Sequence, residues 1–184
     1  MKKKIPLRKY LIQFKPFLIF IGTFFAAYIV LTFIYKFYLN SFGLNDVDGI
    51  TKIVGRNVEQ LMQLFNTDFK VDINRHNPWL DIWYNKKHMA RIIEGCNAIS
   101  VTILFVSFVV AFSGKFKPTF LFILLGIFLI YICNVARIAF LVVLVYNFPG
   151  YAHFLHGVFF PLVIYGMVFV LWVIWINKFS KYAR

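Results

Sequence analysis

Four long apolar runs, separated by short polar segments and one long one, form the pattern of this chain. The runs extend over residues 17–35, 95–112, 119–146 and 153–176. A transmembrane helix needs about 20 predominantly apolar residues, and each run is near that length or longer. The pattern therefore predicts an all-α integral membrane protein, with about four transmembrane helices in one bundle and a single membrane domain over residues 1–184.

The first run, 17–35, must be distinguished from a cleaved signal peptide, because it follows a basic N-terminal flank. The apolar region of a signal peptide is only about 7–15 residues long and ends at a cleavage site of small residues. Ala26 and Ala27 lie in the middle of the run, and no such site follows it. We therefore interpret this run as a retained first span.

The one long polar segment, residues 36–94, separates the first two runs. Within it, the helical spacing of apolar residues predicts an amphipathic helix over about 54–66. The residues concerned are Val54, Val58, Leu61, Met62 and Phe65. Apolar residues then alternate weakly over 69–73 and 80–84, which predicts a pair of short strands around residues 77–78. A surface loop that lies on the bilayer is an equally good interpretation of this segment.

The composition also indicates a membrane protein. Of the 184 residues, 61% are hydrophobic and only 15% are charged, and the mean hydropathy is +0.74. A soluble protein of this size would have to expose large apolar patches. The composition therefore excludes a soluble globular enzyme.

The formal net charge of +13 is typical of nucleic-acid-binding proteins, but the placement of the charges indicates membrane topology instead. All seven acidic residues lie between positions 46 and 94, whereas the two terminal flanks and the 114–118 turn hold eleven Lys and Arg and no acid. Basic segments stay on the cytoplasmic side. Both termini are thus predicted to be cytoplasmic, with the 36–94 loop and the 146–152 turn outside. No nucleic-acid partner is expected.

Three polar side chains that are unusual in membrane helices fall at a similar depth. Cys96 lies 18 residues from Gly114, and Arg137 lies 18 residues from Thr119, so each is about 27 Å from the inner boundary. His153 begins the fourth run, at or above the outer boundary of a ~30 Å hydrocarbon core. Helices that alternate in direction therefore bring a cysteine, an arginine and a histidine to the same outer rim.

These residue types suit a mechanism with a cysteine nucleophile. A thiolate attacks a carbonyl far better than a thiol does, and a nearby cation or helix N-terminus lowers the thiol pKa. Cys96 is expected at the N-terminus of the second span, with Arg137 as the cation and as a stabiliser of the oxyanion. His153 can deprotonate the thiol and later protonate the leaving amine. A carboxylate disfavours a thiolate beside it, so we expect Glu94 to orient the arginine or the histidine instead.

Several neighbouring residues would support such a site. Asn134 shares a helix face with Arg137 at i, i+3. His156 is close enough to replace His153, and Gly157 removes a side chain where a substrate backbone could approach. Pro161 is expected to kink the fourth helix just below them.

Each of these residues also has a purely structural explanation. A cysteine in a membrane helix usually serves packing, and an arginine near a helix end can extend to the headgroups. Cys133, one turn inward from Arg137, is a reserve nucleophile whose depth makes water hard to admit. A disulfide between Cys96 and Cys133 would require the helices to bring them together.

Three short blocks of sequence resemble the exosortase/archaeosortase family of membrane transpeptidases. They are residues 94–98 (Glu-Gly-Cys-Asn-Ala), 134–138 (Asn-Val-Ala-Arg-Ile) and 153–157 (His-Phe-Leu-His-Gly), in the order that the family has them. The resemblance covers the second to fourth runs, and the short chain with its Glu-Gly-Cys-Asn block is most similar to the exosortase F (XrtF) branch. Many family members are longer and have Ser-Gly or Asn-Gly after the cysteine, where this chain has Asn97 and Ala98.

The resemblance implies a membrane-embedded cysteine transpeptidase or peptidase of the bacterial inner membrane. Its partners would be exported proteins that carry a C-terminal motif, a transmembrane helix and a basic tail, and no cofactor or metal is implied. Cys96 would be the nucleophile, Arg137 the stabilising cation and His153 the acid/base, because the spacing from His153 to Gly157 fits the family block better than that of His156. The supporting residues would be Glu94, Asn97, Asn134, His156 and Gly157.

Three other classes of function use the same residues differently. A non-catalytic membrane scaffold or assembly factor for protein export would need the polar side chains only to hold helices together. A metal site could use Cys96, His153 and His156, but the sequence lacks a clustered set of ligands. A transporter is supported least, because no inverted repeat is visible among the four runs.

Overall fold

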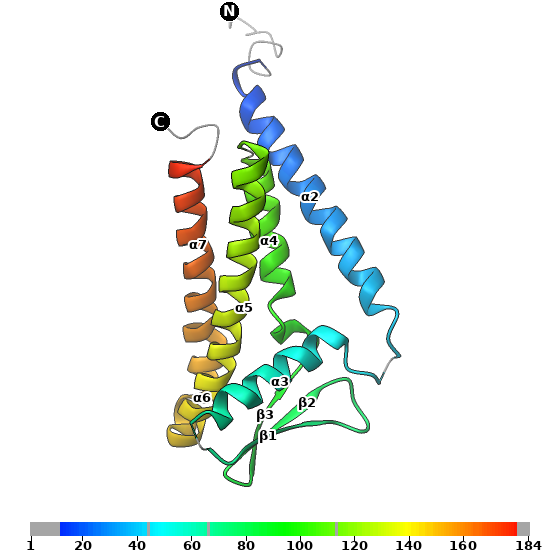
Figure 1. The fold of residues 1–184 in the computed structure, drawn as a ribbon, viewed down its shortest axis with the longest axis vertical. Coiled ribbons are helices and arrows are strands. Elements are labelled where there is room, and N and C mark those ends of the chain that lie inside the picture. The colour runs from blue at the N-terminus through cyan, green and yellow to red at the C-terminus, as the bar shows by residue number, and fades with distance from the viewer. Residues whose placement is uncertain (1–11, 44, 66, 113, 180–184) are drawn as a thin grey trace, which may run out of the picture.

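The computed structural model describes residues 12–43, 45–65, 67–112 and 114–179. Apolar helices run along the long axis of the molecule, and a small α/β layer lies at one end of them (Figure 1). The first long helix begins at Lys15 and the last one ends at Lys178, both at the opposite end. We refer to these two ends as the layer end and the basic end.

Three helical segments are long and apolar enough to cross a membrane. They are α2 (Lys15–Leu39), α5 (Phe116–Asn147) and the continuous segment Pro149–Lys178. This last segment consists of η2 (Pro149–Tyr151), α6 (Ala152–Phe154), the π-helix η3 (Leu155–Phe159) and α7 (Phe160–Lys178). The prediction of an all-α membrane protein with a small additional layer is confirmed.

The second apolar run forms a shorter helix than the other three. Helix α4 (Ile99–Ala111) has 13 residues, which makes it about 20 Å long. The chain before it is a turn, because residues Glu94–Cys96 form the 3-10 helix η1 and Ala98 has a left-handed backbone with φ 64°. Cys96, which we expected at the N-terminus of the helix, lies instead in the turn that precedes it.

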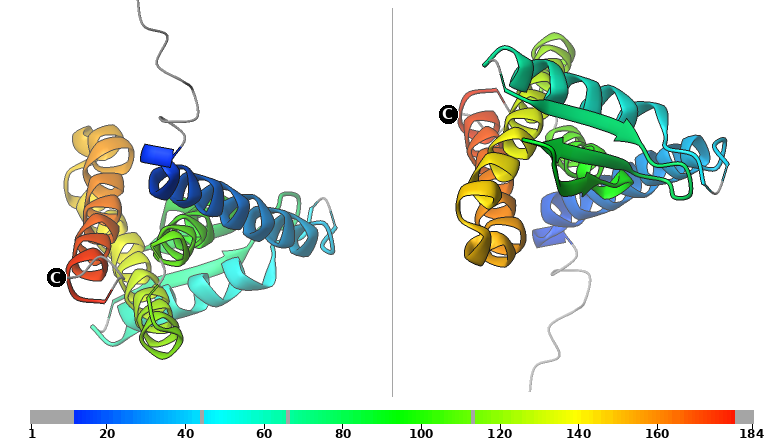
Figure 2. Two further views of the ribbon diagram at one scale, coloured as in Figure 1. Left: turned by 90° about the horizontal axis from the view of Figure 1, so that it is seen from above. Right: turned by 90° about the horizontal axis from the view of Figure 1, so that it is seen from below.

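Helix α4 is central to the bundle and contacts α2, α5 and α7 (Figure 2, left). Its fully buried Phe105 places its ring on the backbone of α5 at Gly126, where an added Cβ would overlap the ring. On another side, Phe108 stacks on Trp172 of α7, with ring centroids 4.2 Å apart. A small residue that lets one helix approach another closely is a common device of membrane helix pairs.

Helix α3 (Gly49–Gln63) is the amphipathic helix that the sequence predicts over 54–66. It begins earlier than predicted because Asp48 caps it, and the Asp48 carboxylate accepts a hydrogen bond from the Thr51 backbone N–H at 2.9 Å. It also approaches the sheet closely, since a Cβ added at Gly55 would overlap the side chain of Leu80.

The rest of the layer is an antiparallel sheet in the order β1 (Phe69–Ile73), β2 (Leu80–Tyr84), β3 (Lys87–Ile92). The predicted strand pair is confirmed, whereas β3 was not predicted. Asn85 and Lys86 join β2 to β3 with φ values of 49° and 63°, as a two-residue type I′ turn requires. The sequence Asn-Lys is a weaker signal for this turn than Asn-Gly.

A single buried cluster joins this layer to the layer end of α5. Its residues come from α3, from the sheet and from α5, and include Val54, Val58, Ile82, Ile92, Val135, Ile138 and Val142. Seen from the layer end, α3 and the strands extend across the helices (Figure 2, right). The long polar segment is therefore a folded layer packed on a membrane helix, and the interpretation as an open surface loop is wrong.

Candidate active site

Cys96 lies between two parts of the fold, four residues after β3 ends and three residues before α4 begins. Its side chain is partly buried and packs against the cluster that joins α5 to the layer. The position of the thiol therefore depends on α5 and β3 as much as on its own helix.

Asn97 holds the turn that carries Cys96. Its buried side-chain amide donates hydrogen bonds to the Tyr35 hydroxyl of α2 at 2.8 Å and to the Thr51 hydroxyl of α3 at 3.3 Å. Its carbonyl oxygen accepts a hydrogen bond from the Ile99 backbone N–H at 3.0 Å, at the start of α4. One side chain thus connects three helices next to the thiol.

Glu94, the carboxylate nearest to Cys96 in the sequence, faces α2. It interacts with the hydroxyl group of Tyr35, the same group that receives a hydrogen bond from Asn97. Glu94 also lines a cavity of about 280 Å³ with Asp46, Asp48 and Trp79, among other residues. Within the described residues, no ion pair joins Glu94 to the arginine or the histidines that it was expected to orient.

Asn134 connects the Asn-x-x-Arg segment of α5 to the cysteine turn. Its side-chain amide donates a hydrogen bond to the Cys96 carbonyl oxygen at 2.9 Å, although the two residues are 38 positions apart. The Asn134 carbonyl oxygen is buried and has no hydrogen-bond partner in the described part of the chain. This hydrogen bond to the Cys96 backbone brings the cysteine turn next to the Asn-x-x-Arg segment of α5.

Arg137 lies one turn beyond Asn134, about 4.5 Å further toward the layer end. Its Nε is buried and finds no hydrogen-bond partner among the described residues. A buried donor without a partner costs free energy, and such a group is available to an oxygen atom of a bound substrate. No hydrogen bond or ion pair joins Arg137 to Cys96 in residues 12–43, 45–65, 67–112 and 114–179.

The two histidines occupy different environments at the layer end of α5. His156 lies in the π-helix η3 and lines a cavity of about 230 Å³ with Arg91 of β3 and Leu141 of α5, among other residues. His153 lies in α6 and is exposed. Neither histidine contacts Cys96 through a hydrogen bond in the described structure.

The candidate residues are arranged along one side of α5. Asn134, Arg137, Leu141 and Val145 follow the spacing i, i+3, i+7, i+11, which places them on one helix face. Asn134 contacts the cysteine turn, and Leu141 and Val145 line the cavity of His156. Since Asn134 and Leu141 are about 10.5 Å apart along the axis, Arg137 lies between the cysteine and the histidine cavity.

The backbone near the histidines leaves open space. A Cβ added at Gly157 would meet nothing within 4 Å. Pro161 is the second residue of α7, which follows the π-helix, and a proline removes the backbone N–H that a helix would use one turn earlier. Single turns of π-helix are frequent at functional sites.

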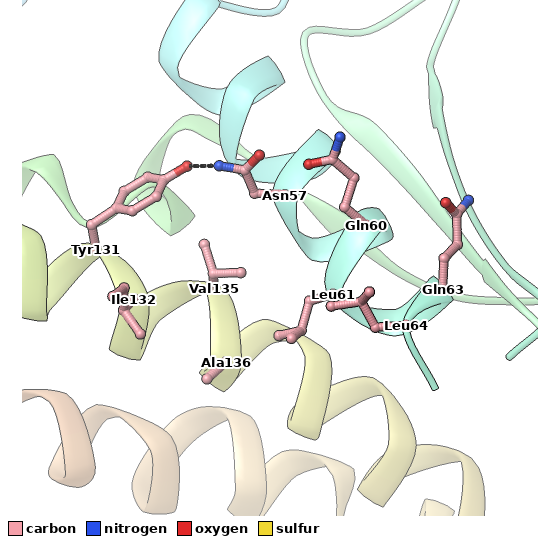
Figure 3. Close-up of a pocket in the computed structure, with 9 residues that line it drawn as sticks. All are labelled: Asn57, Gln60, Leu61, Gln63, Leu64, Tyr131, Ile132, Val135 and Ala136. Carbon is pink, nitrogen blue, oxygen red and sulfur yellow. Dashed lines mark hydrogen bonds between the residues drawn. The ribbon is translucent and has the colours of Figure 1, made fainter. Parts of the chain in front are cut away.

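A cavity between α3 and α5 was not predicted from the sequence. It measures about 760 Å³, and Asn57 donates a hydrogen bond to the Tyr131 hydroxyl there (Figure 3). A second, more apolar cavity of about 390 Å³ adjoins it at Leu61 and Ala136. The side of α3 that lines the larger cavity carries the amide side chains Asn57, Gln60 and Gln63, at every third position of the helix. This spacing is the sequence pattern that could have indicated the cavity.

Potential metal ligands do not cluster in the described part of the chain. Among the described residues, no group of three or more His, Cys, Asp or Glu side chains could hold a metal ion. Both cysteines are free thiols, with Cys133 on α5 four residues before Arg137.

Comparison with known proteins identifies the family. The family model described as transmembrane exosortase (Exosortase_EpsH) matches residues 14–176, from the start of the first apolar helix almost to the end of the last. The search of curated proteins finds no match, and neither does the search of solved structures. Because the family model covers nearly the whole chain, this protein belongs to the transmembrane exosortase family.

Proposed function

We propose that this exosortase is a cysteine transpeptidase or protease that cleaves C-terminal sorting signals from exported proteins, and that it most resembles the exosortase F branch. Its substrates would carry a short motif, a transmembrane helix and a basic tail. Family membership supports a transpeptidase role in the membrane. The positions of Cys96, Asn134 and Arg137 support the choice of the nucleophile and of the group that stabilises the oxyanion.

The reaction would proceed through a thioester. The Cys96 thiolate attacks the carbonyl carbon of the scissile peptide bond, and His153 has accepted the thiol proton. When the carbon–nitrogen bond breaks, His153 returns this proton to the leaving amine. An incoming amine then releases the carrier protein as a new amide, or water releases it as an acid, and Cys96 is regenerated.

The buried Nε of Arg137 is the observation that carries this proposal. It is an unpartnered donor on the helix whose Asn134 holds the Cys96 carbonyl. A substrate carbonyl attacked by Cys96 would bring a negatively charged oxygen to this region, and a pre-positioned cationic donor stabilises such an oxyanion. A purely structural arginine would be expected to have its donors satisfied.

The charges support a membrane orientation. The described residues include Lys15, Lys115, Lys117 and Lys178 near the basic end, and acidic residues lie in and around the α/β layer. By the positive-inside rule, this distribution supports a cytoplasmic basic end, with the layer and Cys96 on the outer face of the inner membrane. Exported proteins would be processed after their folded part has crossed the membrane.

Substitution of Cys96 tests the proposal directly. A tagged exported reporter with a C-terminal apolar helix and basic tail is co-expressed with the full-length chain, and its cleavage is followed by the change in electrophoretic mobility. We expect Cys96→Ala to abolish cleavage and Cys133→Ser, the matched control on α5, to retain it. Full cleavage by Cys96→Ala would remove Cys96 as nucleophile.

The same experiment separates the enzyme from a non-catalytic scaffold. The hydrogen bonds of Asn97 and Asn134, which connect α2, α3, α4 and α5 around Cys96, would also suit a scaffold. A scaffold needs these amides but not the thiol. Reporter processing that is lost in Asn97→Ala and unchanged in Cys96→Ala would favour the scaffold.

A further inference from the structure

The sheet presents an unpaired edge beside the candidate site. The order β1-β2-β3 leaves β3 hydrogen-bonded to one neighbour only, β2. Within the described residues, the backbone of Lys87–Ile92 makes no hydrogen bond outside this ladder. The free N–H and C=O groups of an edge strand can pair with another extended chain.

A cavity opens along this edge. It measures about 230 Å³, and three successive residues of β3, Met89, Ala90 and Arg91, line it. The pairing of β2 with β3 shifts register here and leaves Met89 as an extra residue of β3, and Met89 and Ala90 both pack against the buried cluster. No residue of β2 lines the cavity, so the cavity borders β3 on the side that faces α5. Its opposite wall comes from α5 and from the helical turns that carry His156.

The strand leads directly to the candidate nucleophile. Only four peptide units separate Ile92 from Cys96, so the two Cα atoms are at most about 14 Å apart even in a fully extended chain. The 3-10 turn at Glu94–Cys96 shortens this distance. Met89 and Ala90 pack against the same buried cluster as Cys96. A chain bound beside β3 would therefore lie next to the region of the thiol.

We propose that β3 binds the segment that precedes the apolar helix of the substrate, as an added β-strand whose side chains enter the cavity. This inference rests on the proposed function and specifies how that site would hold its peptide. Main-chain hydrogen bonds would supply affinity, and alternate side-chain contacts would supply specificity. The strand would deliver the scissile bond to Cys96 in an extended conformation, with its carbonyl accessible.

The size and charge of the cavity define the occupant. An added strand lies about 4.8 Å from β3, whereas a helix with side chains is about 10–12 Å wide. A cavity of about 230 Å³ therefore suits the side chains of an extended peptide better than a helix. The lining residues include the cation Arg91 and no acidic residue. The Arg91 guanidinium carbon lies 4.9 Å from the centre of the Trp79 ring, which does not itself line the cavity. A side chain bound beside Arg91 would therefore be neutral or acidic, not basic.

A disulfide scan tests this binding mode without catalysis. The starting variant is Cys96→Ala with Cys133→Ser, which removes both cysteines of the chain and prevents turnover. Arg91→Cys is added on β3 or, as the matched control, Lys70→Cys on the opposite edge strand β1, where Lys70 is exposed. The probe is the tagged reporter described above, with single cysteines at successive positions before its apolar helix, and a mild oxidant forms the disulfides.

We expect Arg91→Cys to give several-fold more cross-linked product than Lys70→Cys, with maxima at every second reporter position. Equal yields from both variants, or maxima at every third or fourth position as in a helix, would overturn the inference. Alternating cross-links together with full cleavage by Cys96→Ala would leave the inference standing and remove the proposed nucleophile. Cleavage that depends on Cys96, without a preference of the cross-links for β3, would support the proposed nucleophile and overturn the binding mode at β3. If cleavage did not depend on Cys96 and the cross-links did not prefer β3, both proposals would be wrong.

Discussion

At the scale of single residues, two asparagine side chains fix the surroundings of Cys96. Asn97 connects the cysteine turn to α2 and α3, and Asn134 connects it to α5. Both amides are almost completely buried, and a buried amide that loses its partners costs about 1–3 kcal/mol. The two amides therefore hold the turn that carries Cys96 in place through contacts with α2, α3 and α5.

The two histidines can be separated by substitution, because both are exposed and neither supports the core. We expect His153→Ala to lower the rate of reporter cleavage by about 100-fold or more, since loss of a general acid/base typically costs that much. His156→Ala, three residues away, is the matched control and should retain most of the rate. The measurement is the initial rate of cleavage at equal protein levels. A large loss in His156→Ala alone would assign the acid/base role to His156, which lines the cavity beside β3.

At the scale of elements, a cluster around Asp81 holds the β1–β2 connection and the β2–β3 ladder together. The Asp81 carboxylate accepts hydrogen bonds from the Asn74 side chain at 2.7 Å and the Trp79 indole at 3.2 Å, and His88 on β3 lies 3.1 Å away. Partial burial by itself would raise the pKa of Asp81. The hydrogen bonds from Asn74 and His88 outweigh burial, so the pKa lies below its usual value.

This pKa predicts how the stability of the layer depends on pH. A carboxyl group with a lowered pKa in the folded state stabilises the fold above its ordinary pKa, which is about 4. The contribution is lost as the pH falls through the lower pKa of the folded state. We expect the unfolding temperature of Asp81→Asn in detergent to fall less steeply than that of the wild type over this range. Parallel curves for the two proteins would contradict the prediction.

At the scale of the whole molecule, close approach between helices determines where α4 lies. The Phe105 ring fills the space left by Gly126 on α5. A second cluster, around Phe105, Ile130 and Trp175, buries the centre of the bundle. The cysteine turn precedes α4, so a change in the packing of α4 would also displace Cys96.

Gly126→Ala tests this packing. The added methyl group would overlap the Phe105 ring, and overpacking of this kind typically costs about 1–3 kcal/mol. We expect a lower unfolding temperature in detergent, and partial recovery in the double variant with Phe105→Leu. Gly22→Ala on α2 is the matched control, because a Cβ there meets nothing within 4 Å. Equal unfolding temperatures for the two alanine variants would show that the contact is not tight.

The membrane fold and the candidate residues could be predicted from the amino-acid sequence alone. Length and apolar composition decide whether a helix can cross a membrane, so 17–35 and 119–146 could be assigned without any contact between them. The amphipathic spacing of α3 identified its buried face in the same way. Cys96, Arg137 and His153 were singled out because polar groups are rare in apolar runs, and that reasoning also needs no tertiary structure.

Only the tertiary structure decided how these residues are arranged. The start of α4 depends on the left-handed Ala98 and on the hydrogen bond from Asn97 to Tyr35, which is 62 residues away. Strand β3 exists because β2 pairs with it, although its own sequence alternates weakly. The contact between Asn134 and the Cys96 carbonyl, and the cavity beside His156, likewise join residues far apart in the chain. Local patterns record burial and helical period, whereas such long-range contacts form only when the elements pack.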